Sequence, residues 1–269
     1  MILGVLLVLL LTFGCVFAVK RAAHKKGADA SESAHKTEQT RSTGAYENVE
    51  LVTEGEKLKE LEAQGKTEEE IAAMTEPILG GAELTMLAGQ TKAQMMSFLL
   101  ETKKGSLIVV DGGWWDDADY LKEQIKQRGG HVSAWFLTHA HTDHVGALLN
   151  LLQSEVDGEN TGITIDHIYY NFASLDWYKK HELGDLGTAD AILTALAGLP
   201  KGEACPVKKG DEILVDDVCI TVLNDRYEPD DDRVGERDGN DASMVYRMLV
   251  NGVTILFTGD LQVDGGNHV

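Results

Sequence analysis

Thr138-His139-Ala140-His141-Thr142-Asp143-His144 is the stretch of this sequence that says most about its fold. Three imidazoles and one carboxylate, all of them metal-binding side chains, fall within six consecutive positions. The apolar run 132–137 comes directly before them and is typical of a buried strand. A tight loop leaving that strand can bring such closely spaced side chains together, and imidazole with carboxylate suits zinc, iron or manganese. The stretch therefore predicts a metal site with room for two ions, against the alternative of a polar loop that is rich in histidine by chance.

The surrounding sequence alternates strand and helix patterns from residue 82 to residue 269, and we assign this range to one domain. Its expected elements are strands over 83–88, 95–102, 106–110, 132–137 and 163–170, helices over 117–128, 145–152 and 188–199, two strands within 207–223, and a hairpin of 244–250 with 253–257. Asn251-Gly252 inside the hairpin is a strong turn signal. With helices on both outer faces, these elements predict an α/β fold arranged as a four-layer αββα sandwich.

Residues 139–144 resemble the H-x-H-x-D-H signature of the metallo-β-lactamase superfamily, and two other segments agree with this resemblance. Residues 106–113, SLIVVDGG, are similar to the strand and D-G-G turn that precede the metal loop in that superfamily. Residues 255–260, ILFTGD, are similar to the strand whose last aspartate bridges two metal ions. The resemblance runs from Leu84 to the C-terminus, about two-thirds of the chain. It implies a metal site at one edge of the sandwich, where loops from both sheets meet.

The resemblance also implies a role for each metal-binding residue. By this analogy His139 and His141 bind a first ion, and Asp143 and His144 bind a second. Asp260 bridges the two ions, because the two oxygens of its carboxylate can each serve one of them. Asp143 additionally orients the attacking water, which makes it the expected catalytic residue. The expected cofactor is Zn²⁺, in a pair of ions, with Mn²⁺ or iron as alternatives.

Two departures from the superfamily pattern bear on this expectation. The superfamily usually places a third histidine for the first ion before the strand that leads to Asp260, but residues 239–243 read GNDAS. They resemble the N-x-x-S form in the hydrolase domain of bacterial competence DNA-channel proteins, so Asn240 and Asp241 are the candidates for completing the first site. The superfamily also carries further strands, a helix and a final metal-binding histidine beyond T-G-D. Because His268 follows Asp260 too closely to be that histidine, we expect a truncated C-terminus or a degraded domain.

Three segments precede the predicted domain. Residues 1–19 are almost wholly apolar and predict a signal peptide or a membrane anchor, so we expect a protein that is membrane-anchored or secreted. No lysine or arginine precedes this run and several follow it, which leaves the side of the membrane open. Residues 20–52 are polar and predict a disordered tether. Capping-box spacings at Thr53 and Thr67 predict short helices within 53–81.

The formal net charge of −20 restricts the class of substrate. Sequence-independent binding of DNA or RNA needs lysine and arginine against the phosphates, and no such cluster occurs beyond the N-terminal region. We therefore expect a metal-dependent hydrolase that acts on a small molecule, either a phosphodiester or a small ester. The N-x-x-S resemblance favours the phosphodiester, and the absence of the third histidine disfavours β-lactams.

Two other functions stay open at this point. One is an iron oxidoreductase on the same fold, although diiron members of the superfamily usually carry glutamate where His141 stands. The other is a non-catalytic, membrane-tethered binding domain, which the short C-terminal part makes credible. Metal analysis and hydrolysis assays separate these alternatives.

Overall fold

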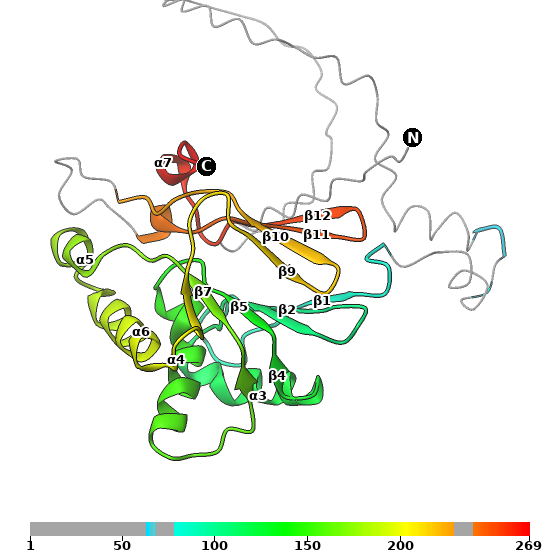
Figure 1. The fold of residues 1–269 in the computed structure, drawn as a ribbon, viewed down its shortest axis with the longest axis horizontal. Coiled ribbons are helices and arrows are strands. Elements are labelled where there is room, and N and C mark those ends of the chain that lie inside the picture. The colour runs from blue at the N-terminus through cyan, green and yellow to red at the C-terminus, as the bar shows by residue number, and fades with distance from the viewer. Residues whose placement is uncertain (1–62, 66, 68–77, 229–238) are drawn as a thin grey trace, which may run out of the picture. The chain divides into compact units, whose positions relative to one another are not determined.

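The computed structural model describes residues 63–65, 67, 78–228 and 239–269, and those from 78 onward belong to one compact unit (Figure 1). The predicted apolar helix of 1–19, the tether of 20–52 and most of the helical segment 53–81 lie outside the described residues. Within the described ranges, no helix combines the length and the apolar character needed to cross a membrane.

A six-stranded sheet forms the centre of the domain, in the order β1-β2-β3-β5-β7-β8. Its strands are β1 (Glu83–Met86), β2 (Phe98–Glu101), β3 (Leu107–Val110), β5 (Ala134–Phe136), β7 (Ile168–Tyr170) and β8 (Ala204–Pro206). The first three strands pair antiparallel, and every pair from β3 onward is parallel. Strands β4 (His131–Val132) and β6 (Thr164–Ile165) form a separate parallel pair and directly precede β5 and β7 in the sequence. Parallel neighbours need crossover connections, which explains why helices follow these strands.

The helices cover one face of this sheet (Figure 1). They are α3 (Ala118–Gln127), α4 (Thr142–Val156), α5 (Leu175–His181) and α6 (Leu186–Gly198), and the short 3-10 helix η1 (Trp115–Asp117) precedes α3. Leu121 and Ile125 of α3 are fully buried, as the amphipathic pattern over 117–128 predicts. Helix α4 begins at Thr142, three residues earlier than predicted, so half of the histidine-rich stretch belongs to its first turn.

A second, four-stranded sheet is antiparallel throughout, in the order β12-β11-β10-β9. Its strands are β9 (Glu212–Val215), β10 (Val218–Val222), β11 (Tyr246–Val250) and β12 (Val253–Phe257). The predicted hairpin of β11 and β12 is confirmed, with Asn251 (φ 48°) and Gly252 (φ 79°) both left-handed, as a tight hairpin turn requires. The 3-10 helix η2 (Gly239–Ala242) and the short helix α7 (Val263–Gly266) flank this hairpin in the chain.

Successive side chains along the strands of the six-stranded sheet point to opposite faces and belong to two separate cores. Leu99, Val109 and Trp135 point to the helices and belong to the core between sheet and helices. Leu100, Val110 and Phe136 point the other way and pack on the second sheet, against residues such as Ile220 and Tyr246. Because both faces are buried, β3 and β5 read as continuous apolar runs in the sequence.

The described residues form three of the four predicted layers, namely helices, the six-stranded sheet and the four-stranded sheet (Figure 1). The prediction of a helical layer on the outer face of the second sheet is not met by any described helix. Leu214 and Leu249, both opposite Cys219 on that face, are 71% and 45% exposed. Among the described residues, the helices that cover the six-stranded sheet all precede β8 in the chain, and only the short η2 and the four-residue α7 come after it.

The fold brings the ends of three strands to one edge. Val110 of β3 lies opposite Phe136 of β5 in a parallel ladder, so the segments that follow these strands leave the sheet together. The loop after β5 also reaches the second sheet, since the Tyr246 hydroxyl donates to the Leu137 carbonyl over 2.8 Å and the Met244 amide donates to the Thr138 carbonyl over 2.9 Å. The residues after β12 therefore meet the histidine-rich stretch where both sheets end.

Candidate metal centre

The histidine-rich stretch divides into a loop and the first turn of a helix. His141 is the N-cap of α4 and is extended (φ −79°, ψ 151°), so His139 and His141 lie on the loop and Asp143 and His144 on the helix. His141 makes no side-chain capping bond, which leaves its ring available for other contacts. The loop-to-helix transition lets these four side chains converge, although a continuous helix would spread them.

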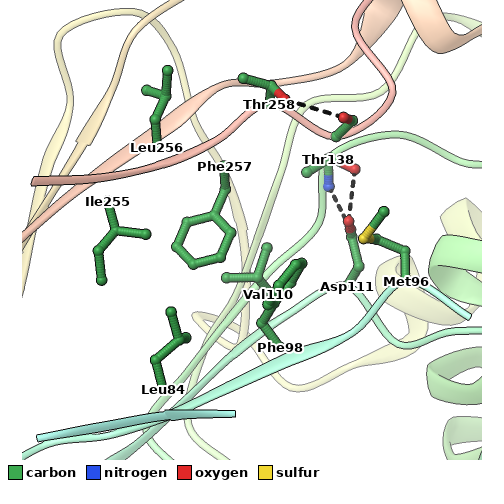
Figure 2. A pocket seen from close by; sticks show the side chains of 11 residues that line it. Leu84, Met96, Phe98, Val110, Asp111, Thr138, Ile255, Leu256, Phe257 and Thr258 are labelled. Carbon is green, nitrogen blue, oxygen red and sulfur yellow. Dashed lines mark hydrogen bonds between the residues drawn. The ribbon is translucent and has the colours of Figure 1, made fainter. Parts of the chain in front are cut away.

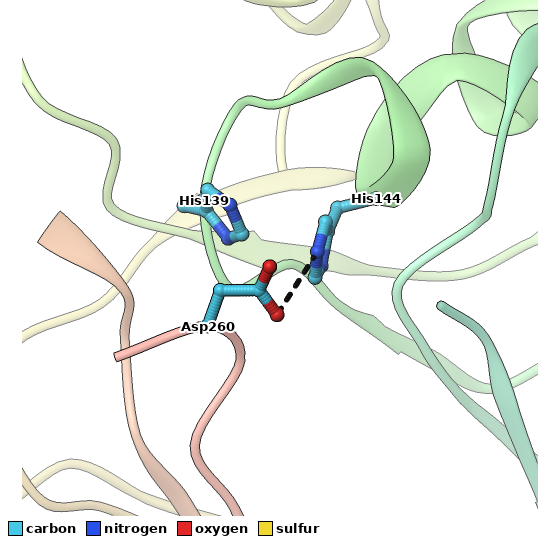
Figure 3. Close-up of side chains that lie close together, drawn as sticks. All are labelled: His139, His144 and Asp260. Carbon is cyan, nitrogen blue, oxygen red and sulfur yellow. Dashed lines mark ion pairs between the residues drawn. The ribbon is translucent and has the colours of Figure 1, made fainter. Parts of the chain in front are cut away.

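His139, His144 and Asp260 form a buried group at this edge (Figure 3). Their potential ligand atoms all lie within 4.8 Å of one another, and His144 Nε2 lies 3.4 Å from Asp260 Oδ1. The Nε2 atoms of His139 and His144 are buried without a hydrogen-bond partner. A buried polar atom of this kind needs an explanation in a native protein, and a bound cation is one. Two imidazole nitrogens facing one carboxylate fit a zinc-like ion.

Asp111, the first residue of the D-G-G turn, holds His144 in place. Its Oδ2 lies 2.9 Å from His144 Nδ1, while Thr138 donates to the same carboxylate through its amide (2.8 Å) and its hydroxyl (2.9 Å). A carboxylate on Nδ1 fixes the ring and directs Nε2 outward, as partners of metal-binding histidines do. From the sequence, Asp111 was predicted only as part of a turn. Its position directly after a strand that neighbours the metal loop was the available signal.

The surroundings set the two imidazoles in different charge states. Burial lowers the pKa of His144, but the negative charge of Asp111, its hydrogen bond to Nδ1 and the nearby charge of Asp260 outweigh burial and raise that pKa to about 10. Burial and the neighbouring rings of His144 and His141 hold the pKa of His139 well below its usual range, against a small opposing effect of Asn240. The two carboxylates thus favour the positively charged form of the His144 ring. The His139 ring stays neutral and can offer a lone pair.

Asp143 stands at the border of the buried group. Its Oδ2 lies 3.9 Å from His144 Nε2, and its side chain is 19% exposed. Burial raises the pKa of the Asp143 carboxyl, and the charge of His144 partly opposes this shift. The structure therefore brings this predicted residue next to His144, on the side that is open to solvent.

His141 is turned toward a second group, which the sequence argument missed. Its Nε2 lies 3.0 Å from Glu182 Oε1, and the ligand atoms of His141, Glu182 and Asp185 lie within 4.8 Å of one another. The rings of His139 and His141 remain neighbours, with centroids 4.4 Å apart. The ligand atoms thus group His141 with two carboxylates rather than with His139, which differs from the pairing expected from the superfamily.

Asn240 and Asp241, the two residues predicted to complete the first metal site, make different contacts in the structure. Asn240 lies at His139, where its side chain contributes to the pKa of that ring. Asp241 instead accepts a hydrogen bond from the Gly265 amide over 2.8 Å, so one of its oxygens is engaged with α7. Ser243 Oγ approaches His139 Nδ1 to 3.3 Å, and Thr138 Oγ1 approaches the same atom to 3.1 Å.

An apolar pocket opens between the two sheets beside the group (Figure 2). Strands β1, β2, β3 and β12 line it with Leu84, Phe98, Val110, Ile255 and Phe257. Asp111 and Thr138, which support His144, also border this pocket, as does Gly259 next to Asp260. An apolar cavity therefore adjoins the polar residues of the candidate centre.

Fold and site together define a mixed α/β domain whose histidine-rich loop follows a central strand and meets an aspartate from a second sheet. This chain belongs to the metallo-beta-lactamase superfamily, whose family model matches residues 93–268. Members of this superfamily are generally metal-dependent hydrolases and typically bind zinc, which agrees with the candidate metal-binding groups seen here.

Several solved structures are similar to this chain. A metallo-beta-lactamase with a HARLDQ motif from Cronobacter sakazakii shares 15% identity over 66% of this chain and 60% of its own, with a TM-score of 0.40. YhfI from Bacillus subtilis, a metallo-beta-lactamase fold protein, shares 13% over 66% and 62%, with a TM-score of 0.41. BJP-1, a subclass B3 metallo-beta-lactamase of Bradyrhizobium japonicum, shares 17% over 58% and 51%, with a TM-score of 0.35. The chain spans less than two-thirds of the length of each of these proteins. A search of curated proteins gave no match.

Proposed function

We propose that this protein is a metal-dependent hydrolase whose centre is formed by His139, His144 and Asp260. The observation that carries the proposal is the pair of buried Nε2 atoms without hydrogen-bond partners, both close to one carboxylate. Such a set is costly in a protein interior unless a cation completes it. Membership of the superfamily supports the same chemistry.

Each residue contributes a separate part of the chemistry. A bound metal ion supplies a water of lowered pKa and polarises the scissile bond. His139 and His144 present their Nε2 atoms, and Asp111 keeps the His144 ring oriented through Nδ1. Asp143, at the open side of the group, orients the attacking water and accepts its proton at a carboxylate oxygen. Burial raises the pKa of this carboxyl, which makes it a better proton acceptor than an exposed aspartate.

The substrate we propose is a small ester or phosphodiester. The N-x-x-S resemblance at 240–243 supports the phosphodiester, and the net charge of −20 disfavours long polyanions. The apolar segment 1–19 supports a protein that is anchored to a membrane or secreted.

The test uses the full chain stripped of metal and reloaded with Zn²⁺ or Mn²⁺. Metal content is measured first, and then hydrolysis of bis(p-nitrophenyl) phosphate, p-nitrophenyl acetate and nitrocefin. We expect hydrolysis of one of the first two, loss with EDTA, and a fall of at least about a hundredfold in His139→Ala and Asp260→Asn. His131→Ala is the matched control, since His131 is 52% exposed and pairs with Asp166 on the surface.

Two outcomes would contradict the proposal. Bound iron with redox activity would make the protein an oxidoreductase on the same fold. Full metal loading without hydrolysis of any of the substrates would favour a non-catalytic binding domain.

A further inference from the structure

Thr138 is a buried residue whose backbone and side chain are both held in place. It is 1% exposed, its amide donates to Asp111 Oδ1 over 2.8 Å, and its carbonyl accepts from the Met244 amide over 2.9 Å. Gly259 packs so closely against it that a Cβ on that glycine would lie 2.8 Å from Thr138 Oγ1. Threonine is β-branched and therefore has little freedom at χ1. The position of the Thr138 hydroxyl is thus fixed.

This hydroxyl lies against one carboxylate and two imidazoles. Its Oγ1 is 2.9 Å from Asp111 Oδ2, 3.1 Å from His139 Nδ1 and 3.3 Å from His144 Nδ1. A hydroxyl has a single proton to donate, and an ionised carboxylate can only accept. Because a hydrogen bond to a charged acceptor is stronger than one between neutral groups, the proton is directed to Asp111. Toward the two rings, Thr138 Oγ1 can then act only as an acceptor.

Asp111 keeps its position without help from the Thr138 hydroxyl. The Ser97 hydroxyl and Trp135 Nε1 each donate to the Asp111 carbonyl oxygen over 3.2 Å. The Thr138 amide and His144 Nδ1 hold the carboxylate itself. Removal of the Thr138 hydroxyl alone therefore leaves the contact between Asp111 and His144 in place.

The ring proton of His139 has two possible positions. A neutral imidazole carries one proton on either Nδ1 or Nε2, and the hydrogen bond made by one nitrogen decides which. With the proton on Nε2, a lone pair on Nδ1 would face a lone pair on Thr138 Oγ1 across 3.1 Å. With the proton on Nδ1, His139 donates to Thr138, and its Nε2 carries the lone pair that a cation needs.

Ser243 also approaches the His139 ring but does not discriminate between these two forms. Its Oγ lies 3.3 Å from His139 Nδ1. A serine hydroxyl can accept from a protonated nitrogen or donate to an unprotonated one, so it suits either position of the ring proton. The choice therefore depends on Thr138, whose proton is directed to Asp111.

We propose that Thr138 is a positioning residue that selects the Nδ1–H tautomer of His139. One carboxylate then orients both imidazoles of the candidate centre, because Asp111 contacts His144 directly and acts on His139 through Thr138. This inference rests on the proposed function only for the cation that the two Nε2 atoms would bind.

The experiment determines which nitrogen of the His139 ring carries the proton. Long-range proton–nitrogen NMR is recorded on the metal-free full chain at a pH of about 8, above the ordinary pKa of histidine. We expect the Nδ1–H tautomer in the unmodified protein and in Thr138→Ser, which keeps the hydroxyl. Thr138→Val keeps the branched shape and the amide bond to Asp111. It should bring the Nε2–H tautomer of His139 into the spectrum and leave the His144 ring unchanged.

Metal affinity gives a second reading of the same variants. Competition with a chelator should show a Zn²⁺ affinity at least about tenfold lower in Thr138→Val, since partners that orient a metal-binding histidine have effects of this size. In Thr138→Ser the affinity should stay near that of the unmodified protein. Thr221→Val is the matched control, because it removes a hydroxyl that contacts Arg247 on the second sheet, and it should change neither reading.

Two results would overturn the inference. The Nε2–H tautomer of His139 in the unmodified protein would do so without any variant, even if Thr138→Val does not fold. An Nδ1–H tautomer retained in folded Thr138→Val would show that Ser243 or Asn240 orients the ring instead. The Nδ1–H tautomer without hydrolysis would contradict only the proposed function, whereas the Nε2–H tautomer with hydrolysis would contradict only this inference.

Discussion

At the scale of single residues, the site depends on partners that stand behind the metal-binding side chains. Asp111 has a left-handed backbone (φ 57°), which aspartate tolerates better than most residues. That conformation ends β3 and directs the carboxylate to Thr138 and His144. Asp111 thus links the end of β3, the loop after β5 and the first turn of α4.

The loss of stability in Asp111→Asn should depend on pH. In metal-free protein, the pKa of His144 rises to about 10, so its protonated ring stabilises the fold fully below about pH 6.5. That stabilisation is lost as the pH rises toward 10. The variant should therefore be less stable by about 3 kcal/mol at pH 6.5, and the difference should shrink by pH 10. Urea unfolding in EDTA at several pH values measures the difference in free energy of unfolding between the variant and the unmodified protein. A difference that does not change with pH would contradict this role of Asp111.

Gly239→Ala should disturb the contact between His141 and Glu182. The new methyl group would overlap His141 Nε2 and Glu182 Oε2, so these groups must separate. We expect a loss of about 1–3 kcal/mol in the free energy of unfolding, as measured by urea unfolding in EDTA. Gly198→Ala at the far end of α6 is the control, because no atom lies within 4 Å of its added Cβ. Equal effects of the two substitutions would refute the prediction.

At the scale of elements, α4 is positioned by close contact with the turn that follows β3. A Cβ on Gly146 would lie 2.6 Å from the Trp115 amide nitrogen and 3.2 Å from the Gly113 carbonyl oxygen. The Ala147 amide donates to that carbonyl over 3.0 Å. This contact sets where the N-terminus of α4, and with it Asp143 and His144, faces the second sheet.

Gly146→Ala should therefore be destabilising although alanine favours helices. The clash is with backbone atoms that cannot move aside, so we expect a loss of about 1–3 kcal/mol in the free energy of unfolding. Chemical denaturation measures this loss. Gly198→Ala again serves as the control and should be neutral or slightly stabilising, since alanine has the higher helix propensity. A stabilised Gly146→Ala would show that the turn gives way easily.

At the scale of the whole molecule, the proposed metal centre of His139, His144 and Asp260 joins the two sheets. His139 and His144 follow β5 of the six-stranded sheet, whereas Asp260 follows β12 of the four-stranded sheet. Between the sheets, the rings of Phe136 and Tyr246 pack with centroids 5.1 Å apart, and burial holds the pKa of Tyr246 well above its usual range. A cation shared by residues from both sides would strengthen this junction.

Metal removal should consequently lower the stability of the entire domain. At a free metal concentration of one hundred times the dissociation constant, binding adds about 2.7 kcal/mol to the free energy of unfolding. EDTA should remove this gain in the unmodified protein, as followed by thermal or urea unfolding. Asp260→Asn should gain much less from metal, and His131→Ala should gain as much as the unmodified protein. An EDTA-insensitive midpoint would contradict a cation that bridges the sheets.

The order and type of most elements, and the position of the histidine-rich stretch, could be predicted from local sequence patterns. Apolar periodicity, the Asn251-Gly252 turn and the apolar run before His139 report on neighbours in the chain, and local patterns are enough for such features. It also indicated that Asp260 meets the histidines, which the geometry shows, while its role as a ligand stays a prediction.

The partners of these residues became known only from the folded structure. Asp111 is 33 positions from His144 and Glu182 is 41 positions from His141, so no local pattern links them. The same holds for Gly239, whose missing side chain matters only because α5 and the loop before α4 pack around it. Helix packing chose these contacts, and it also left the outer face of the second sheet without a described helix. Which side chains share an ion depends on distances of a few ångströms that the chain sets only after it has folded.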